Sequence, residues 1–263
     1  MTRIIAIANQ KGGVGKTTTT INLAASLAAT RRRVLLVDLD AQGNATMGCG
    51  VDKYRLKWSV RDVLLEAVSA RDAIATSEGL GFSVLPANAD MTEAEIKLRD
   101  MPAGDFALKL ALETVAADFD YILIDCPPAL SKLTVNAFVA ADGVLIPMQC
   151  EYYALEGLTA LVDTINKIQR VINPRLEIDG LLRTMFDPRN NLSNDVSAQL
   201  IQHFGDKVYR TLVPRNVRLA EAPSHGVPVM TYDSASAGAK AYLALAGELL
   251  RRHDGGQLRL GNE

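Results

Sequence analysis

Residues 3–18 read RIIAIANQKGGVGKTT, a short apolar run followed directly by a glycine-rich loop, a lysine and two threonines. Loops of the pattern G-x-x-x-x-G-K-[ST], placed between a strand and a helix, hold nucleotide phosphates. Gln10 stands at the first glycine position of that pattern, whereas Gly15, Lys16 and Thr17 keep its end. The stretch therefore predicts a first strand that delivers a phosphate-binding loop to the edge of a sheet.

The chemistry of a phosphate loop gives each of its residues a task. We expect the three glycines to adopt positive φ, so that successive N–H groups point at one anion. Lys16 can reach the β- and γ-phosphates, the hydroxyl of Thr17 can bind Mg²⁺, and the helix that begins near Lys16 adds its N-terminal dipole. Lys11 is an additional lysine, five positions ahead of the usual one. The predicted nucleotide contacts are Lys11, Gly12, Gly13, Val14, Gly15, Lys16, Thr17 and Thr18.

The composition is that of an ordinary globular protein, with 48% apolar and 22% charged residues. A net charge of −2 argues against a globally basic nucleic-acid binder but leaves room for a local basic face. The first apolar run, Ile4–Ala8, is too short for a signal-peptide core or a membrane span, so we expect a cytoplasmic protein. Cys49, Cys126 and Cys150 form no C-x-x-C pair and are typical of free thiols.

Apolar runs of strand type alternate with helical patterns along the chain. We expect strands at Ile4–Ala8, Val34–Asp38, Phe82–Pro86, Tyr121–Asp125, Gly143–Met148, Ile178–Phe186 and Val208–Val213. We expect helices at Thr17–Thr30, Phe106–Ala117, Gly157–Ile172 and about Ala235–His253. This order predicts an α/β fold with a doubly wound, mostly parallel sheet and helices on both faces. Residues 1–253 are expected to form one domain, and 254–263 a flexible tail.

A second acidic element is required beside a phosphate loop, because the Mg²⁺ shell needs a carboxylate. Residues 121–128 read YILIDCPP, a buried strand that ends in Asp125 and a Pro-Pro turn. An aspartate at the carboxyl end of a strand beside the first strand would reach the metal, most simply through water. An ordinary strand end with an aspartate-initiated turn is the alternative, and the glycine loop upstream favours the metal site.

A third element is LLVDLDAQGN at residues 35–44, in which Asp38 and Asp40 share one side of an extended segment. At a strand end both carboxylates would face the cleft that holds the phosphates. Hydrolysis needs a group that orients the attacking water, and Asp40 is the candidate for this role. Asp38 is better placed to support the loop or the metal shell.

Five segments together are similar to the ParA/Soj-type chromosome-partitioning ATPases, within the deviant Walker A class of P-loop NTPases. The segments are Lys11–Thr18, Asp38–Asn44, Asp125–Pro128, Gln149–Gly157 and Val213–Gly226, spread over nearly the whole chain. One departure is Ala41, where the family commonly has proline. The acids and the Gln-Gly-Asn that follows remain.

The resemblance implies roles for the matching residues. Lys11 would cross a dimer interface to the partner's nucleotide, Asp40 would activate water, and Asp125 would be the Walker B acid, with ATP and Mg²⁺ as cofactors. Lys11, Lys16, Asp40 and Asp125 are then the catalytic residues, and Thr17 and Asp125 hold the metal. Pro214 and Asn216 match the segment around adenine. From the residues alone, a base-binding pair and a simple turn are equally supported there.

Family resemblance also implies that the ATP-bound homodimer binds DNA without sequence preference and that a ParB-type centromere-binding protein stimulates hydrolysis. The protein would then be nucleoid-associated and would not bind membranes. Between residues 167 and 218 nine basic residues stand against five acidic ones, an excess of four. The charge pattern alone favours a solvent-exposed surface of mixed charge that contacts no DNA, whereas the family resemblance favours contact with DNA. The candidate contacts are Arg189 and Arg218, with Lys207, Arg210 and Lys240 in second place.

Other members of the wider class remain alternatives. A membrane-associated ATPase similar to MinD would end in an amphipathic helix, but the apolar residues of the final helix are expected to pack on the core. An electron donor similar to the nitrogenase iron protein would need two cysteines at the dimer axis. A cargo-positioning ATPase would use the same switch.

Overall fold

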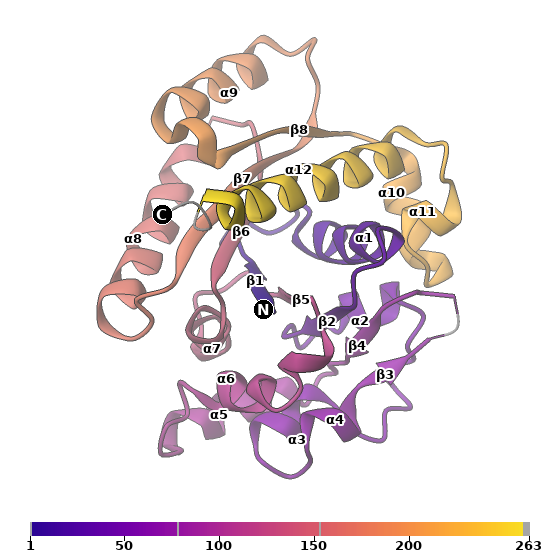
Figure 1. Ribbon diagram of the computed structural model, residues 1–263, viewed down its shortest axis with the longest axis vertical. Coiled ribbons are helices and arrows are strands. Elements are labelled where there is room, and N and C mark those ends of the chain that lie inside the picture. Colours follow the sequence, from indigo (N-terminus) through magenta and orange to yellow (C-terminus); the bar gives the residue numbers. More distant parts are fainter. Residues whose placement is uncertain (1, 78, 153, 260–263) are drawn as a thin grey trace.

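The computed structural model describes residues 2–77, 79–152 and 154–259. Its centre is an eight-stranded sheet of order β3-β4-β2-β5-β1-β6-β7-β8 (Figure 1). All neighbouring strands are parallel except β3 and β4. The strands are β1 Arg3–Ile7, β2 Val34–Asp38, β3 Ala75–Thr76, β4 Ser83–Leu85, β5 Tyr121–Asp125, β6 Gly143–Gln149, β7 Glu177–Phe186 and β8 Val208–Pro214. The predicted doubly wound fold is confirmed.

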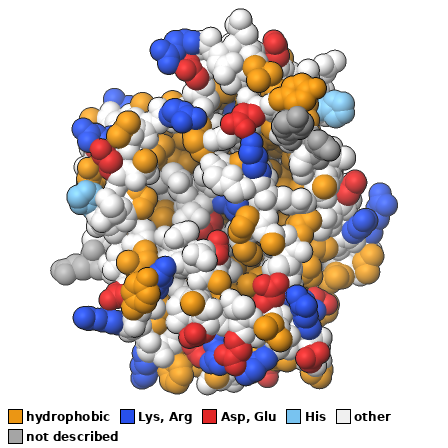
Figure 2. All heavy atoms as spheres, turned by 180° about the vertical axis from the view of Figure 1, so that it is seen from behind, with side chains coloured by type: hydrophobic (Ala, Val, Ile, Leu, Met, Phe, Trp, Pro, Cys, Tyr) orange, Lys and Arg blue, Asp and Glu red, His pale blue; other side chains and the backbone are white. Residues whose placement is uncertain are grey.

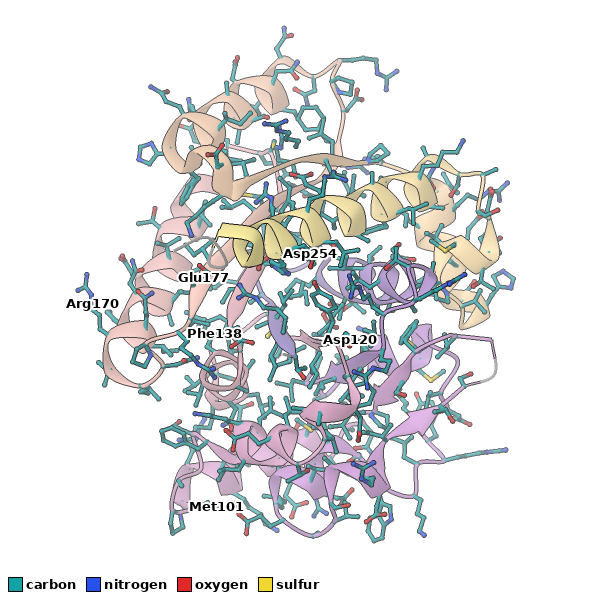
Figure 3. The ribbon with its side chains drawn as sticks, viewed as in Figure 1. Met101, Asp120, Phe138, Arg170, Glu177 and Asp254 are labelled. Atoms are coloured by element: carbon teal, nitrogen blue, oxygen red, sulfur yellow. The ribbon has the colours of Figure 1, made fainter. Side chains whose placement is uncertain are left out.

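Helices cover both faces of this sheet. One face carries α3 Val60–Leu64, α4 Ala70–Ala73, α5 Met91–Asp100, α6 Ala107–Glu113, α7 Lys132–Ala140, α8 Ala154–Val171 and α9 Asn191–Phe204. The other carries α1 Lys16–Ala29, α2 Asn44–Gly48, α10 Val217–Glu221, α11 Val229–Tyr232 and α12 Ala237–Arg259. In Figure 3 Arg170 of α8 projects into solvent, whereas Phe138 of α7 lies among the buried side chains of its layer.

Alternation along the strands explains why both faces are covered. In β1, Ala6 packs into one core layer, whereas Ile5 and Ile7 pack into the other. The same alternation of neighbouring side chains runs through β2 and β5, in which every residue is buried. Because both sides of these strands meet helices, their sequences are continuously apolar rather than alternating.

Differences from the sequence prediction lie at the periphery. The short antiparallel strand β3 was not expected, because two residues at a sheet edge carry no periodic signal. Helix α6 ends at Glu113, and a separate 3-10 turn follows at Ala116–Asp118. Helix α12 continues to Arg259, six residues into the segment expected to be a flexible tail, while 260–263 lie outside the described residues.

Two glycines should respond in opposite ways to replacement by alanine, because one has no room for a side chain and the other lies in a helix with open space beside it. A Cβ at Gly180 in β7 would lie 2.3 Å from Cε2 of the buried Tyr209 and 3.0 Å from the carbonyl oxygen of Lys207. Gly180→Ala should therefore lower the free energy of unfolding by roughly 1–3 kcal/mol. A Cβ at Gly157 in α8 meets nothing within 4 Å. Gly157→Ala should stabilise by up to about 1 kcal/mol in urea denaturation, and equal effects of the two changes would contradict this packing.

Candidate nucleotide site

The site lies where the central strands end. In the sheet register Asp125, the last residue of β5, stands beside Ile7 of β1 on one side and Asp38 of β2 on the other. The glycine loop leaves the same end of β1 and leads into α1. Ligands of open α/β sheets bind at this carboxyl edge, so the topology brings the three predicted motifs into one place.

The loop has the shape of an anion cradle. Gly13 has φ of 73° and Gly15 has φ of 88°, both in the left-handed region that favours glycine. Gly12 does not adopt positive φ, so the prediction was wrong for that residue. A Cβ on Gly12 would meet nothing within 4 Å, which places it on the open side of the loop. Gly15 caps α1, which begins at Lys16 as predicted within one residue.

Two residues that the sequence analysis did not identify hold the loop in place. The hydroxyl of Thr184 in β7 donates to the carbonyl of Val14 at 2.8 Å. The amide of Asn9 donates to the carbonyl of Pro147 at 2.8 Å, and its Oδ1 accepts from the N–H of Lys11 at 3.0 Å. Asn9 was visible in the sequence as the residue after the strand, but nothing in the sequence marks Thr184. Thr184 thus ties the loop to β7, and Asn9 ties the start of the loop to β6.

Lys16 is drawn into the site. It is buried, and its Nζ donates to the carbonyl of Lys11 at 3.3 Å, so the ammonium lies inside the curve of the loop. Burial lowers the pKa of Lys16, and the nearby carboxylates of Asp125 and Asp40 oppose that shift. A phosphate bound in the loop would supply the anion that this ammonium lacks.

Acidic groups gather opposite Lys16. Asp125 is fully buried and accepts from the hydroxyl of Thr17 at 2.7 Å and from that of Thr20 at 3.0 Å. Burial raises the pKa of Asp125, and the adjacent Asp38 raises it further. A carboxylate beside a threonine hydroxyl is a pair of oxygen ligands that suits a hard divalent cation such as Mg²⁺, and a bound cation would favour the ionised form of Asp125. Thr20, four residues after Lys16, was not predicted.

Asp38 and Asp40 lie in different surroundings and make different hydrogen bonds. Asp38 is fully buried and accepts from the N–H and the hydroxyl of Thr46, both at 2.8 Å, and from the N–H of Asp40 at 3.0 Å. It therefore braces the turn after β2, whereas the sequence predicted that it would support the phosphate loop or the metal shell. Burial raises the pKa of Asp38. Asp40 is half-buried and caps the N–H of Gln42 at 3.0 Å through Oδ1.

The predicted adenine segment follows β8 at the same edge of the sheet. Pro214 is the last residue of β8 and stands beside Phe186 of β7. Asn216 precedes α10 and makes no side-chain capping bond. Its Oδ1 is buried without a hydrogen-bond partner among the described residues. An unsatisfied acceptor of this kind suits a donor such as an exocyclic amino group.

Lys11 lies at the outer rim of the loop. Its Nζ forms an ion pair with Oε2 of Glu151 at 2.5 Å, and the two side chains are 45% and 51% exposed. Glu151 follows β6 in the Gln149–Gly157 segment. In this single chain, therefore, Lys11 contacts its own glutamate and leaves the phosphate cradle to Lys16.

The whole arrangement has close counterparts among known proteins. The family described as "AAA domain" matches residues 2–178. The chromosome partitioning protein ParA of Caulobacter vibrioides is 50% identical over 252 residues, or 95% of this chain and 94% of that protein. The sporulation initiation inhibitor protein Soj of Bacillus subtilis is 51% identical over 249 residues, or 95% and 98%. The chain belongs to the ParA/Soj family.

A solved structure with a different name has the same fold. Cobyrinic acid a,c-diamide synthase from Mycobacterium smegmatis, crystallised with ADP and magnesium, has a TM-score of 0.86 and is 39% identical, covering 97% of both chains. A cavity of about 340 Å³ in the present chain includes Thr17, Thr18 and Asn44 in its lining. It lies between the first turns of α1, the short helix α2 and residues 222–227, which follow α10.

The cysteines of this ParA/Soj chain do not suit an exposed cluster. Cys126 and Cys150 are 1% and 5% exposed, and burial raises the pKa of both thiols. Metal ligation requires thiolates. The geometry therefore disfavours the iron-protein alternative.

Two of the basic residues expected to contact DNA are engaged by acids. Arg189 pairs with Asp187 at 2.8 Å, and Arg218 pairs with Glu221 at 2.8 Å. On the face shown in Figure 2, basic and acidic side chains are interspersed. A phosphate backbone would have to compete with these carboxylates for both arginines.

Of the other three candidates, two line a common groove and one lies at the start of β8. Lys207 donates to the carbonyl of Ile178 at 2.9 Å, and it precedes β8 directly. Arg210 of β8 and Lys240 of α12 line the same groove. The structure thus brings Arg210 and Lys240 together, and places Arg189 and Arg218 on other segments.

The buried acids predict how the stability of the ligand-free protein depends on pH. Because the pKa values of Asp38 and Asp125 are raised on folding, their contribution is full below the ordinary aspartate pKa near 4 and is lost as pH rises through the raised values. Asp125→Asn removes one ionisable group, and its two hydroxyl partners can reorient. The variant should lose less stability than the wild type between about pH 5 and pH 8, by up to about 4 kcal/mol, because each pH unit within the shifted range is worth about 1.4 kcal/mol.

Chemical denaturation across this pH range measures the effect, and Asp195→Asn on the exposed side of α9 is the matched control. If the free energy of unfolding changed with pH equally in the wild type and in Asp125→Asn, the pKa of Asp125 would not be raised by folding.

Proposed function

We propose that this chain is an ATP-dependent DNA-partitioning switch, in which residues 1–253 act as one ATPase domain. The observation that carries the proposal is Lys11, a second lysine on the half-exposed rim of a phosphate loop that already has Lys16 inside it. One bound nucleotide needs only the inner lysine. The outer one is free to serve the nucleotide of a second subunit once its bond to Glu151 opens.

ATP and Mg²⁺ are the proposed cofactors. The loop and Lys16 would hold the phosphates, Thr17 and Asp125 would hold the metal, and Pro214 and Asn216 would contact adenine. Support comes from the Thr17–Asp125 contact, from the unsatisfied Oδ1 of Asn216 and from the related synthase solved with ADP and magnesium. Bound Mg²⁺ would bridge phosphate oxygens and offset their charge.

Asp40 is proposed to orient the attacking water. Its Oδ1 accepts from the N–H of Gln42, which orients the carboxylate, and its charge is close enough to act on the ammonium of Lys16. A ParB-type centromere-binding protein would stimulate this step. Hydrolysis to ADP and phosphate would then separate the subunits and release DNA.

Non-specific DNA is the proposed ligand of the ATP-bound homodimer. Pairing two subunits doubles the basic groups that face one duplex, so counterion release favours the dimer over the monomer. The proposed contacts are Arg189, Arg218, Lys207, Arg210 and Lys240. The protein would therefore act in the cytoplasm on the nucleoid, in chromosome or plasmid segregation.

A membrane-associated function similar to that of MinD has less support. Tyr242, Leu245, Ala246 and Leu249 of α12 are all buried against the core, so the apolar face of the final helix is already occupied. Among the described residues, no helix has both the length and the apolar character for crossing a bilayer. Sedimentation with liposomes and ATP separates the two functions.

Lys11→Ala tests the dimer switch. The variant should keep ATP binding, because Lys16 remains, but lose ATP-dependent dimerisation and DNA retention. Light scattering and DNA retention with ATP, ADP and no nucleotide measure both. Lys97→Ala removes a similarly ion-paired lysine from α5 and is the matched control. Unchanged ATP-dependent DNA retention in Lys11→Ala would refute the switch.

Salt titration tests the DNA contacts one residue at a time. Alanine at a residue that contacts phosphate should reduce the slope of log affinity against log salt by about 1, uniformly across DNA sequences. Arg99→Ala on α5, whose guanidinium faces Glu95 at 3.9 Å, is the control. A slope that stays constant in all five variants would place the DNA surface elsewhere.

A further inference from the structure

A groove of about 1050 Å³ runs between α9, β8 and α12, and the proposed function leaves most of it unused. It is about three times as large as the cavity beside Thr17. Figure 1 shows α9 and α12 on either side of β8, and residues of all three elements line the groove. The groove uses residues 208–211 at the start of β8, whereas the predicted adenine contacts follow the other end of that strand.

Cations dominate the lining. Arg183, Arg210, Lys240, Arg251 and Arg252 stand against only Asp206 and Glu248. In the described part of the chain, the side chains of Arg210, Lys240 and Arg251 form no ion pair.

Glu248 is not available to balance these cations. Its carboxylate accepts from the N–H groups of Arg210 and Thr211, at 2.8 and 2.9 Å, and from Arg252 at 2.9 Å. The groove therefore presents uncompensated positive charge to a ligand.

Arg183 supplies a donor without an acceptor. It is only 6% exposed, and its two terminal nitrogens donate to the hydroxyl of Ser197 at 2.8 Å and to the carbonyl of Tyr209 at 2.7 Å. Its Nε is buried and has no hydrogen-bond partner among the described residues. Arg183 therefore contributes its positive charge to the groove, while its guanidinium is held in place by protein partners.

Apolar side chains mark the walls of the groove. Ile201 of α9 is 48% exposed and Leu243 of α12 is 45% exposed, and both line it. Exposed branched side chains on facing walls of a basic groove suit a ligand that has its own apolar face.

Along α12 the lining runs from Lys240 through Ala244 and Gly247 to Arg251, so it follows one face of the helix. Eleven residue steps at 1.5 Å give a length of about 16 Å, or three helical turns. That is too long for a single phosphate and matches a short helix.

We propose that this groove binds an acidic amphipathic helical segment of a partner protein. Leucine-like side chains of the segment would pack against Ile201 and Leu243, and its carboxylates would pair with Arg210, Lys240 and Arg251 along the rim. A DNA backbone uses the cations but gains nothing from the two apolar side chains, which favours the peptide. Arg210 and Lys240 are shared with the proposed DNA contact, so the apolar pair distinguishes the two ligands.

A designed peptide tests the proposal without ATP or DNA. The probe is a fluorescein-labelled helix of about 12 residues, with leucine at i, i+4 and i+7 and glutamate on the flanking positions, measured by anisotropy. A second peptide carries lysine in place of each glutamate. The acidic peptide should bind saturably and more weakly at raised salt, and the basic one should not bind.

Matched variants locate the binding. Leu243→Ser and Ile201→Ser should each weaken the acidic peptide about tenfold, whereas Val171→Ser on α8, which is 81% exposed, should leave it unchanged. DNA retention should be unaffected by Leu243→Ser. Lack of saturable binding, equal binding of the basic peptide, or peptide affinity unmoved by both serine variants would overturn the proposal.

Two further outcomes would assign the groove to another occupant and overturn the proposal equally. One is a loss of DNA affinity in Leu243→Ser, which makes the groove a DNA surface. The other is nucleotide-free self-association, measured by analytical ultracentrifugation, that Leu243→Ser abolishes. Neither result depends on whether Lys11 controls the dimer. The peptide test can therefore fail while the Lys11→Ala test of the switch succeeds, and the reverse.

Discussion

The carboxylate of Asp125 organises the centre of this molecule. It ends β5 between β1 and β2, and it ties the strand to α1 through the hydroxyls of Thr17 and Thr20. A buried carboxylate is tolerated only where donors or a cation compensate it. Asp125 therefore joins the end of β5 to the start of α1, and the neighbouring Asp38 holds the turn after β2, so two buried carboxyl groups lie side by side where a bound cation would favour their ionised forms.

Much of this could be read from the sequence, because strong local patterns and the global fold agree. Buried strands such as Ile122–Ile124 are continuously apolar, and the loop motif fixes the strand-to-helix order around it. Asp38, Asp125 and Pro214 fall at the sheet edge because each follows or ends a recognisable strand. The carboxyl-edge rule then places them together without any knowledge of contacts.

The remaining features depend on which strands become neighbours. Thr184 supports Val14 only because the chain folds β7 back near β1, and its own sequence surroundings are an ordinary strand. Gly12 lacks the positive φ expected of it because spacing does not determine which glycine of a loop makes the turn. The partner of Lys11 likewise comes from Glu151, 140 residues away, a contact that no local pattern encodes.

Glu248 has a consequence for how these chains can assemble. Strand β8 is an edge of the sheet, and exposed edge strands invite backbone pairing with another chain. Here the carboxylate of Glu248 occupies the N–H groups of Arg210 and Thr211, and Arg252 reaches the carbonyl of Val208. With two N–H groups and one carbonyl at its start taken by α12, this part of β8 is a poor template for continuous intermolecular sheet growth, and copies of the chain can meet through side-chain surfaces instead.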